Sequence, residues 1–248
     1  MFQRVFFSAI AAGLLAGVFI SGVQSVTTTP IILQAEAFEG HGHHNDARRP
    51  PNPAIQPAAF IGSPVALRHQ VGESHSHAEG ASDWSPRDGL ERALFTTLAN
   101  CLVGVGFALL IVAGYALRGG PMSIGVGILW GAGGFVVFTL APGLGLPPEV
   151  PGALTADLSA RQLWWVSAVV GAALGLSLMV FMPSVPWKFL GAVAMVIPHL
   201  AGAPRPDGIG GPVPPEIAGH FVAASIAVSA IFWVTLGSLS AAFYRRFA

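Results

Sequence analysis

Six of the eight histidines lie in one stretch of the chain, between residues 27 and 92. Five of them form two short groups, with His41, His43 and His44 in the first and His75 and His77 in the second. Carboxylates lie among them, and imidazole together with carboxylate suits divalent Co, Ni, Zn or Cu. A short histidine-rich tract is typical of metal binding. We predict that these five histidines collect a divalent metal ion; a solvated spacer or a pH-sensitive segment is the alternative.

The two remaining histidines, His199 and His220, lie in apolar segments. An ionisable side chain in such a segment is a candidate functional site by default. If the chain crosses the membrane six times, both fall near the outer ends of their segments and close to Glu216. That placement predicts a mouth at which a metal ion enters the protein. Two interfacial histidines hydrogen-bonded to backbone carbonyls are an equally good interpretation.

Asn100 and Cys101 are polar groups deep within an apolar run, and we consider them, with Glu216, for an ion path. Asparagine in a membrane helix more often makes an interhelical hydrogen bond, and a buried cysteine usually packs. Carboxylates are absent from the centres of the apolar runs, which argues against a proton-coupled pump. The residues form no catalytic arrangement, so we predict that the protein is not an enzyme and binds no permanent cofactor.

The composition of the 248 residues indicates a membrane protein. Hydrophobic residues make up 53% of the chain and charged residues only 10%, against roughly 25% charged residues in a soluble domain. The net charge is zero and the sequence has no basic stripe, which excludes the usual footprint of nucleic-acid binding. One cysteine excludes a disulfide framework.

The apolar runs divide the chain into a transmembrane helix over 1–26, an irregular His- and Pro-rich loop over 27–92, and a transmembrane bundle over 93–248. The bundle segments are expected at about 93–117, 122–140, 162–182, 187–200 and 218–243. The predicted fold is an all-α, polytopic helical bundle of five to six transmembrane segments with a long extramembrane loop. The segment 187–200 is the doubtful one, because 14 residues are too short to span ~30 Å squarely.

The first run, from Val5 to Val23, is longer than the ~7–15 apolar residues of a signal peptide, so a retained helix is favoured over a cleaved signal. Counting six spans puts both chain ends in the cytoplasm and the histidine loop in the periplasm. Five basic residues then face the cytoplasm, as the positive-inside rule favours, whereas four arginines face out; these are Arg87, Arg92, Arg161 and Arg205. Three GxxxG pairs are expected to bring helices together; they are Gly13 with Gly17, Gly127 with Gly131, and Gly171 with Gly175.

Several stretches resemble one known family. The motif Pro198-His199-Leu200-Ala201-Gly202-Ala203-Pro204 resembles the PHxxGAP signature of the CbtA family, a proposed cobalt transporter subunit. The stretches 94–107, 143–152 and 160–165 are similar to the same family, which usually has about five helices. The resemblance implies a bacterial inner (cytoplasmic) membrane protein, a small single-helix partner of the CbtB type, and Co²⁺ uptake linked to cobalamin supply.

These observations lead to one main hypothesis. The loop histidines collect Co²⁺, pass it to His199 and His220 at the outer mouth, and the ion then crosses between helices past Asn100 and Cys101. Imidazole sites bind Co²⁺, Ni²⁺ and Zn²⁺ alike, so the sequence does not select among them. A non-conducting metal-binding accessory or sensor, or a membrane scaffold with incidental histidines, remains the alternative.

Overall fold

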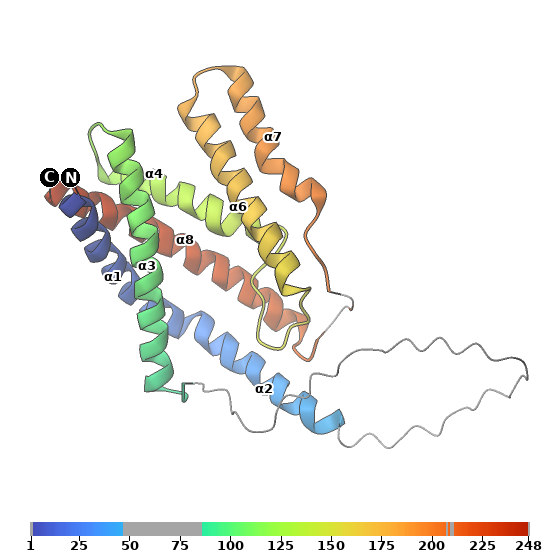
Figure 1. The fold of residues 1–248 in the computed structure, drawn as a ribbon. Helices are drawn as coiled ribbons and strands as arrows, with labels where there is room; N and C mark the ends of the chain where they lie inside the picture. The colour runs from blue at the N-terminus through green and yellow to red at the C-terminus, as the bar shows by residue number, and fades with distance from the viewer. Residues whose placement is uncertain (1, 47–85, 207, 209–210, 248) are drawn as a thin grey trace, which may run out of the picture.

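The computed structural model describes residues 2–46, 86–206, 208 and 211–247, and for residues 39–46 it describes the backbone alone. Within these residues the chain is helical and contains no β-strand (Figure 1). The helices are α1 (Phe2–Val26), α2 (Thr28–Asp46), α3 (Leu90–Arg118), α4 (Ile124–Phe135), α5 (Ala141–Gly143), α6 (Leu158–Phe181), α7 (Val185–Ala201) and α8 (Pro215–Arg246), with a π-helical turn, η1 (Val136–Leu140), between α4 and α5.

Small residues let the central helices α1, α3, α4 and α8 pack backbone against backbone. A Cβ atom added at Gly17 of α1 would lie 2.5 Å from the Cα of Cys101 on α3. Gly127 and Gly131 of α4 meet the backbone of α8 in the same way. Close approach of this kind is the usual basis of helix association in lipid. All three predicted GxxxG pairs therefore lie at helix contacts, as expected; the third joins α6 to α7.

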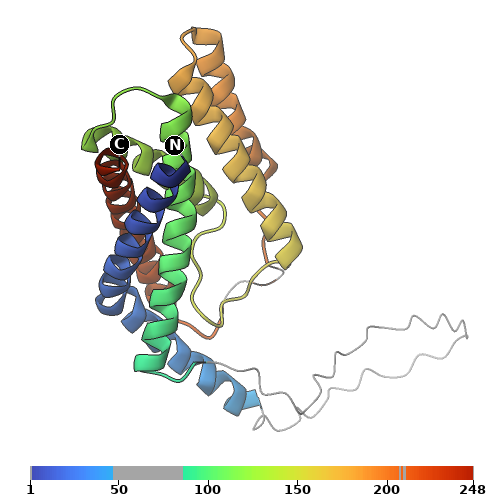
Figure 2. The ribbon, with the colours of Figure 1, turned by 60° about the vertical axis from the view of Figure 1, so that its left-hand side comes forward.

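Helices α6 and α7 form an antiparallel hairpin beside this central group (Figure 2). Gly175 of α6 and Gly191 of α7 are so close that a Cβ on either would lie within 3.0 Å of the other residue's carbonyl oxygen. A small apolar cluster of Val137, Ala141 and Ala172 connects the hairpin to the end of α4. The hairpin is thus one compact unit with a narrow attachment to the rest of the bundle.

The two chain ends lie at the same end of the bundle (Figure 1). The Arg4 Nε–H donates to the carbonyl oxygen of Tyr244 at 2.7 Å, and the guanidinium lies 3.6 Å from the centre of the Tyr244 ring. Five described helices, counting α4 to α5 as one, are long and apolar enough to cross a membrane, and α7 is a shorter apolar helix of 17 residues. The two chain ends lie at the same end of the bundle, so the chain runs along the bundle an even number of times. The five long helices account for five of these runs, and α7 is the sixth.

Charge is distributed unequally between the two ends of the bundle. The end that carries the termini has five basic residues, namely Arg4, Arg118, Lys188, Arg245 and Arg246. The described carboxylates all lie at the opposite end, in or beside α2 and the first turns of α3, α6 and α8. Four described arginines also lie at that opposite end; these are Arg87, Arg92, Arg161 and Arg205. Among the described residues, the end with the termini is therefore purely basic, and the opposite end, called the acidic end below, carries both signs of charge with carboxylates in the majority.

The structure corrects one expectation about the segment 27–92. Its first part forms α2, separated from α1 by Thr27 alone, where an irregular loop was predicted. Pro30 lies in the first turn of α2, where its missing N–H breaks no intrahelical bond, so it does not end the helical stretch. The apolar side chains of Ile31 and Ala35 are buried against the bundle. That burial outweighs the low helix propensity of Gly40 and Gly42 further along.

Candidate functional site: a polar cleft at the acidic end

A cleft of about 760 Å³ opens between α1, α2, α3 and α8. Its mouth lies at the acidic end, beside Asp88 and Arg92. Most of the wall surface is apolar, and hydroxyl and amide side chains are interspersed in it; these are Ser21, Gln24, Ser25, Thr28, Thr29, Thr96, Thr97, Asn100, Ser225 and Ser229. Such groups supply oxygen atoms that coordinate or solvate a cation within an otherwise apolar bundle.

Asn100 is the polar centre of this cleft. Its Nδ2 group donates to the Ser21 hydroxyl oxygen at 2.9 Å and to Gln24 Oε1 at 2.6 Å. These two bonds join α3 to α1 and use the donors of the amide, so the Asn100 carbonyl oxygen remains as an acceptor at the cleft wall. The predicted path residue Asn100 thus lines a real cavity, and it also makes the interhelical bonds that were the alternative interpretation.

A second cavity of about 190 Å³ continues inward from the cleft. It shares Gln24, Asn100, Val228 and Ser229 with the cleft and ends against Phe107 and Phe232. Phe107 belongs to an aromatic cluster in which its ring centre lies 4.7 Å from that of Trp233. Because these rings fill the middle of the bundle, the cleft is open toward the acidic end and closed toward the basic end.

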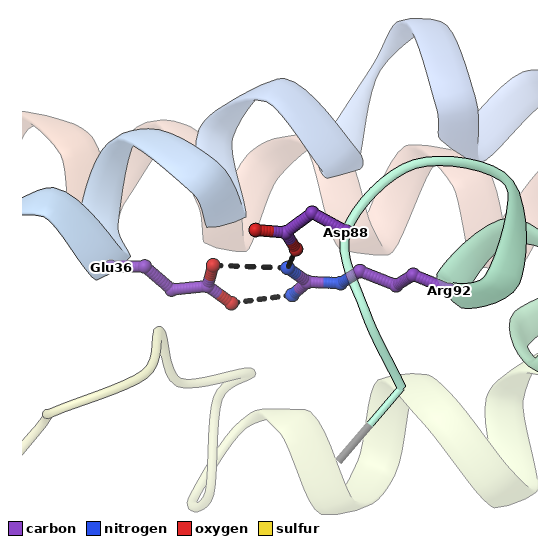
Figure 3. Close-up of polar contacts among 3 residues, drawn as sticks. All are labelled: Glu36, Asp88 and Arg92. Atoms are coloured by element: carbon purple, nitrogen blue, oxygen red, sulfur yellow. Dashed lines mark hydrogen bonds and ion pairs between the residues drawn. The ribbon is translucent and has the colours of Figure 1, made fainter.

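Three charged side chains meet at the mouth of the cleft (Figure 3). Arg92 of α3 contacts both carboxylate oxygens of Glu36 on α2, with Nη1 lying 3.0 Å from Oε2. The same Nη1 donates to Asp88 Oδ1 at 3.0 Å. One guanidinium between two carboxylates gives the group a net charge of −1, and the bidentate geometry is the strongest form of such a pair.

His199 lies at the joint between the α6–α7 hairpin and the end of α4. Its Nδ1 lies 3.0 Å from the carbonyl oxygen of Met195, one turn earlier in α7, and its Nε2 lies 2.9 Å from the carbonyl oxygen of Ala141. The ring also packs edge-on against Trp164, whose Nε1–H donates to the carbonyl oxygen of Pro198 at 3.0 Å. Both ring nitrogens thus face backbone carbonyls, as the second interpretation of this residue expected.

The other predicted residues are distributed as follows. His220 and Glu216 are exposed on the first turns of α8. Cys101 is buried on α3 with its thiol 3.6 Å from the carbonyl oxygen of Leu14, and it lies at the contact with α1 and not in the cleft wall.

The loop histidines lie largely beyond what the structure describes. His41, His43 and His44 fall within the range of α2, but their side chains are outside the described part, as are His75 and His77 altogether. In the part of the chain that is described, no three His, Cys, Asp or Glu side chains are grouped to hold a metal ion. The metal-binding role of the histidines stays a prediction.

Sequence reasoning missed the charged group and the hydroxyl walls. Glu36 lies in the segment 27–92, which was predicted to be a loop, and Arg92 directly precedes the predicted segment 93–117. Serine and threonine are common in membrane helices, so Ser225 and Ser229 carried no signal. Four-residue spacing on α8 places these two serines on one face, and that spacing was the available clue.

Comparison with known proteins identifies one family. The family model of CbtA, described as a probable cobalt transporter subunit, matches residues 2–245, which is nearly the whole chain. The searches found no match among curated proteins and none among solved structures. With a family match over this length, the chain belongs to the CbtA family of probable cobalt transporter subunits.

Proposed function

We propose that the protein is a membrane subunit of a Co²⁺ uptake transporter and that the polar cleft is its outer vestibule. The observation that supports this most is the position of the cleft, which opens at the end of the bundle that carries all described carboxylates. A divalent cation is attracted to such an end. Oxygen-bearing side chains along the walls replace part of its hydration shell as it moves inward.

The charges of the two ends support one orientation. Basic residues concentrate on the cytoplasmic side of membrane proteins. The end with the termini has five of the nine described basic residues, and three of the four at the other end are ion-paired with carboxylates. The basic end therefore faces the cytoplasm, the acidic end faces the periplasm of a bacterial inner membrane, and the histidine-rich segment lies on the periplasmic side. The membrane potential then favours inward movement of a cation by ~2.3 kcal/mol per charge per 100 mV.

Transport proceeds in three stages in this proposal. The histidines between residues 41 and 77 raise the local concentration of Co²⁺. The ion enters the cleft past Asp88 and Glu36 and reaches Asn100. It then passes the aromatic cluster around Phe107 when the α6–α7 hairpin moves, since the Trp165 ring of the hairpin lies beside Phe138 of that cluster. His199 serves as a structural joint beside this route, and His220 remains a candidate ligand at the outer surface.

Metal accumulation in cells that lack their own cobalt importer tests this function. The chain is expressed alone and with a small single-helix partner of the CbtB type, and Co, Ni and Zn are measured together by mass spectrometry. Selective gain of cobalt is expected, and its dependence on the partner shows whether this chain is sufficient. Unchanged metal content, with the protein shown to be in the membrane, contradicts the proposal.

Deleting residues 40–79 tests the collecting role of the histidine segment. The deletion is expected to reduce uptake mainly at low external cobalt, where capture limits the rate. Replacing the six histidines of this segment with glutamine provides the matched variant, because it removes the imidazoles and keeps the chain length. Equal loss at high and low cobalt contradicts a collecting role.

One observation favours a second function. The cleft ends at packed aromatic rings, and the described residues contain no grouped metal ligands beyond it. An accessory protein that holds the ion on the outer side for a separate conducting subunit needs no passage through its own bundle. Uptake that persists when Phe107 is replaced by tryptophan, which enlarges the aromatic plug, favours this accessory role.

A further inference from the structure

We propose that α2 is a lid that narrows the mouth of the cleft, hinged at Thr27 and held against the bundle by the ion pair between Glu36 and Arg92. The purpose of the lid, which is to control entry into the vestibule, rests on the proposed function. The geometry of the lid and the test of the lid do not depend on that function, because both concern access of water-soluble molecules to the cleft.

Helix α2 covers the cleft along one side. Thr28, Thr29, Ile32 and Leu33 contribute to the cleft wall. On the adjoining strip of the helix surface, Thr28 and Ile31 are each 7% exposed and Ala35 is fully buried, so this part of α2 rests on the bundle by a narrow contact. Among the side chains of α2 that the structure describes, these three are the buried ones, and such a helix separates from the bundle more readily than the central helices, which are joined by their backbones.

The junction between α1 and α2 has the chemistry of a hinge. Thr27 is the one residue between the two helices, and its N–H donates to the carbonyl oxygen of Gln24 at 3.2 Å, in place of the usual bond four residues back. Pro30 has no N–H to donate to the carbonyl of Val26. Helix hydrogen bonding is therefore interrupted across the junction, and bending there requires no further bond to break.

The ion pair is the latch of this lid (Figure 3). Arg92 holds Glu36 through both carboxylate oxygens, and Asp88 keeps the guanidinium in place from the side of α3. The side chains of Arg92 and Glu36 are 30% and 34% exposed, so water and ions reach the pair. A partly exposed pair of this kind is strong enough to bias the lid and weak enough to open.

Cysteine accessibility in full-length protein in lipid nanodiscs tests the lid. The native cysteine is removed by Cys101→Ala, and a reporter is introduced by Ser225→Cys, at a half-buried position in the cleft wall on α8. A reference cysteine at Ser159, exposed at the same end of the bundle, measures the reactivity of the reagent itself. The rate of modification by a membrane-impermeant maleimide is the readout.

The variant Arg92→Gln is expected to raise the reporter rate several-fold and to leave the reference unchanged. The matched control is Arg161→Gln, which breaks the ion pair with Glu149, a pair of similar exposure at the same end outside the cleft. This control should leave the reporter rate unchanged. Exchanging the two charges by Glu36→Arg with Arg92→Glu should restore slow labelling, which separates loss of the latch from misfolding.

Salt provides a second test on the unaltered latch. Raising ionic strength from ~0.01 to ~1 M shortens the Debye length from ~30 to ~3 Å. The reporter rate should rise with salt when Arg92 is present and should be insensitive to salt in Arg92→Gln.

Several results would contradict the proposal that α2 is a lid. These are an unchanged reporter rate in Arg92→Gln, an equal rise in Arg161→Gln, and fast labelling in the charge-exchanged protein. Normal cobalt uptake together with unchanged labelling refutes the lid and leaves the proposed function intact. Faster labelling in a protein that moves no cobalt supports the lid and refutes transport.

Discussion

Replacing His199 with glutamine separates a structural joint from a metal ligand. The imidazole lies 2.9 Å from the Ala141 carbonyl oxygen and 3.0 Å from that of Met195. The glutamine Nε2 stands where the imidazole Nε2 does, so it can donate to the Ala141 carbonyl oxygen, which is the contact that joins α7 to the end of α4, but it does not replace Nδ1 beside Met195. Glutamine therefore restores a joint, whereas it does not replace imidazole as a ligand for Co²⁺.

The contacts of His199 set the size of the effect. Polar contacts between membrane helices contribute about 0.6 kcal/mol on average, and an edge-on aromatic contact such as that with Trp164 contributes about 1 kcal/mol. A neutral imidazole has one N–H and donates to one of the two carbonyl oxygens. Losing that bond and the ring contact in His199→Ala should cost about 1.5 kcal/mol. For a domain of this size that corresponds to a fall in Tm of roughly 3–6 °C.

Thermal unfolding in detergent and cobalt uptake in cells form the assay. The expected result is a lowered Tm and reduced uptake for His199→Ala, with both largely recovered in His199→Gln. A glutamine variant that unfolds at the normal temperature but takes up as little cobalt as the alanine variant would refute the joint and assign His199 to metal binding.

Three further predictions use other parts of the structure. Gly17→Leu should strongly lower Tm because its side chain meets the α3 backbone, while Gly22→Ala, with nothing within 4 Å of its Cβ, should not; thermal unfolding compares them. Asn100→Leu should reduce cobalt uptake while the protein remains folded, because the cleft loses its central amide; normal uptake would remove Asn100 from the path. In a cysteine-free background, a cysteine at Ser159 should react with an impermeant reagent in intact cells and one at Ser184 should not; the reverse pattern would invert the proposed orientation.

The sequence predicted the membrane helices because their signal is long and apolar. Each of the five spans lies within a few residues of the predicted segments, and the doubtful segment 187–200 is the short helix α7. The contacts of the glycine pairs could also be predicted from the sequence, since four-residue spacing puts both members of a pair on one helix face. These features depend on local composition and periodicity, which a single sequence contains in full.

The cleft was not predictable in the same way. It depends on which helices become neighbours, and residues as distant as Ser21 and Ser225 meet only in the folded bundle. Asn100 was recognised because an amide is rare in an apolar run, whereas serines there are ordinary. The pair of Glu36 with Arg92 joins residues 56 positions apart across a segment that was predicted as irregular. Its partners could not be identified without the helical form of α2.

The backbone contacts between glycines also decide which parts of the bundle can move. Helices that touch through Gly13, Gly17 and Gly104, or through Gly127 and Gly237, have no layer of flexible side chains between them. They cannot slide past one another without collision of main-chain atoms. The α6–α7 hairpin is joined internally in the same way, so it moves as a single body. Any cycle between outward and inward access is therefore expected to be a motion of that hairpin and α2 against a rigid frame.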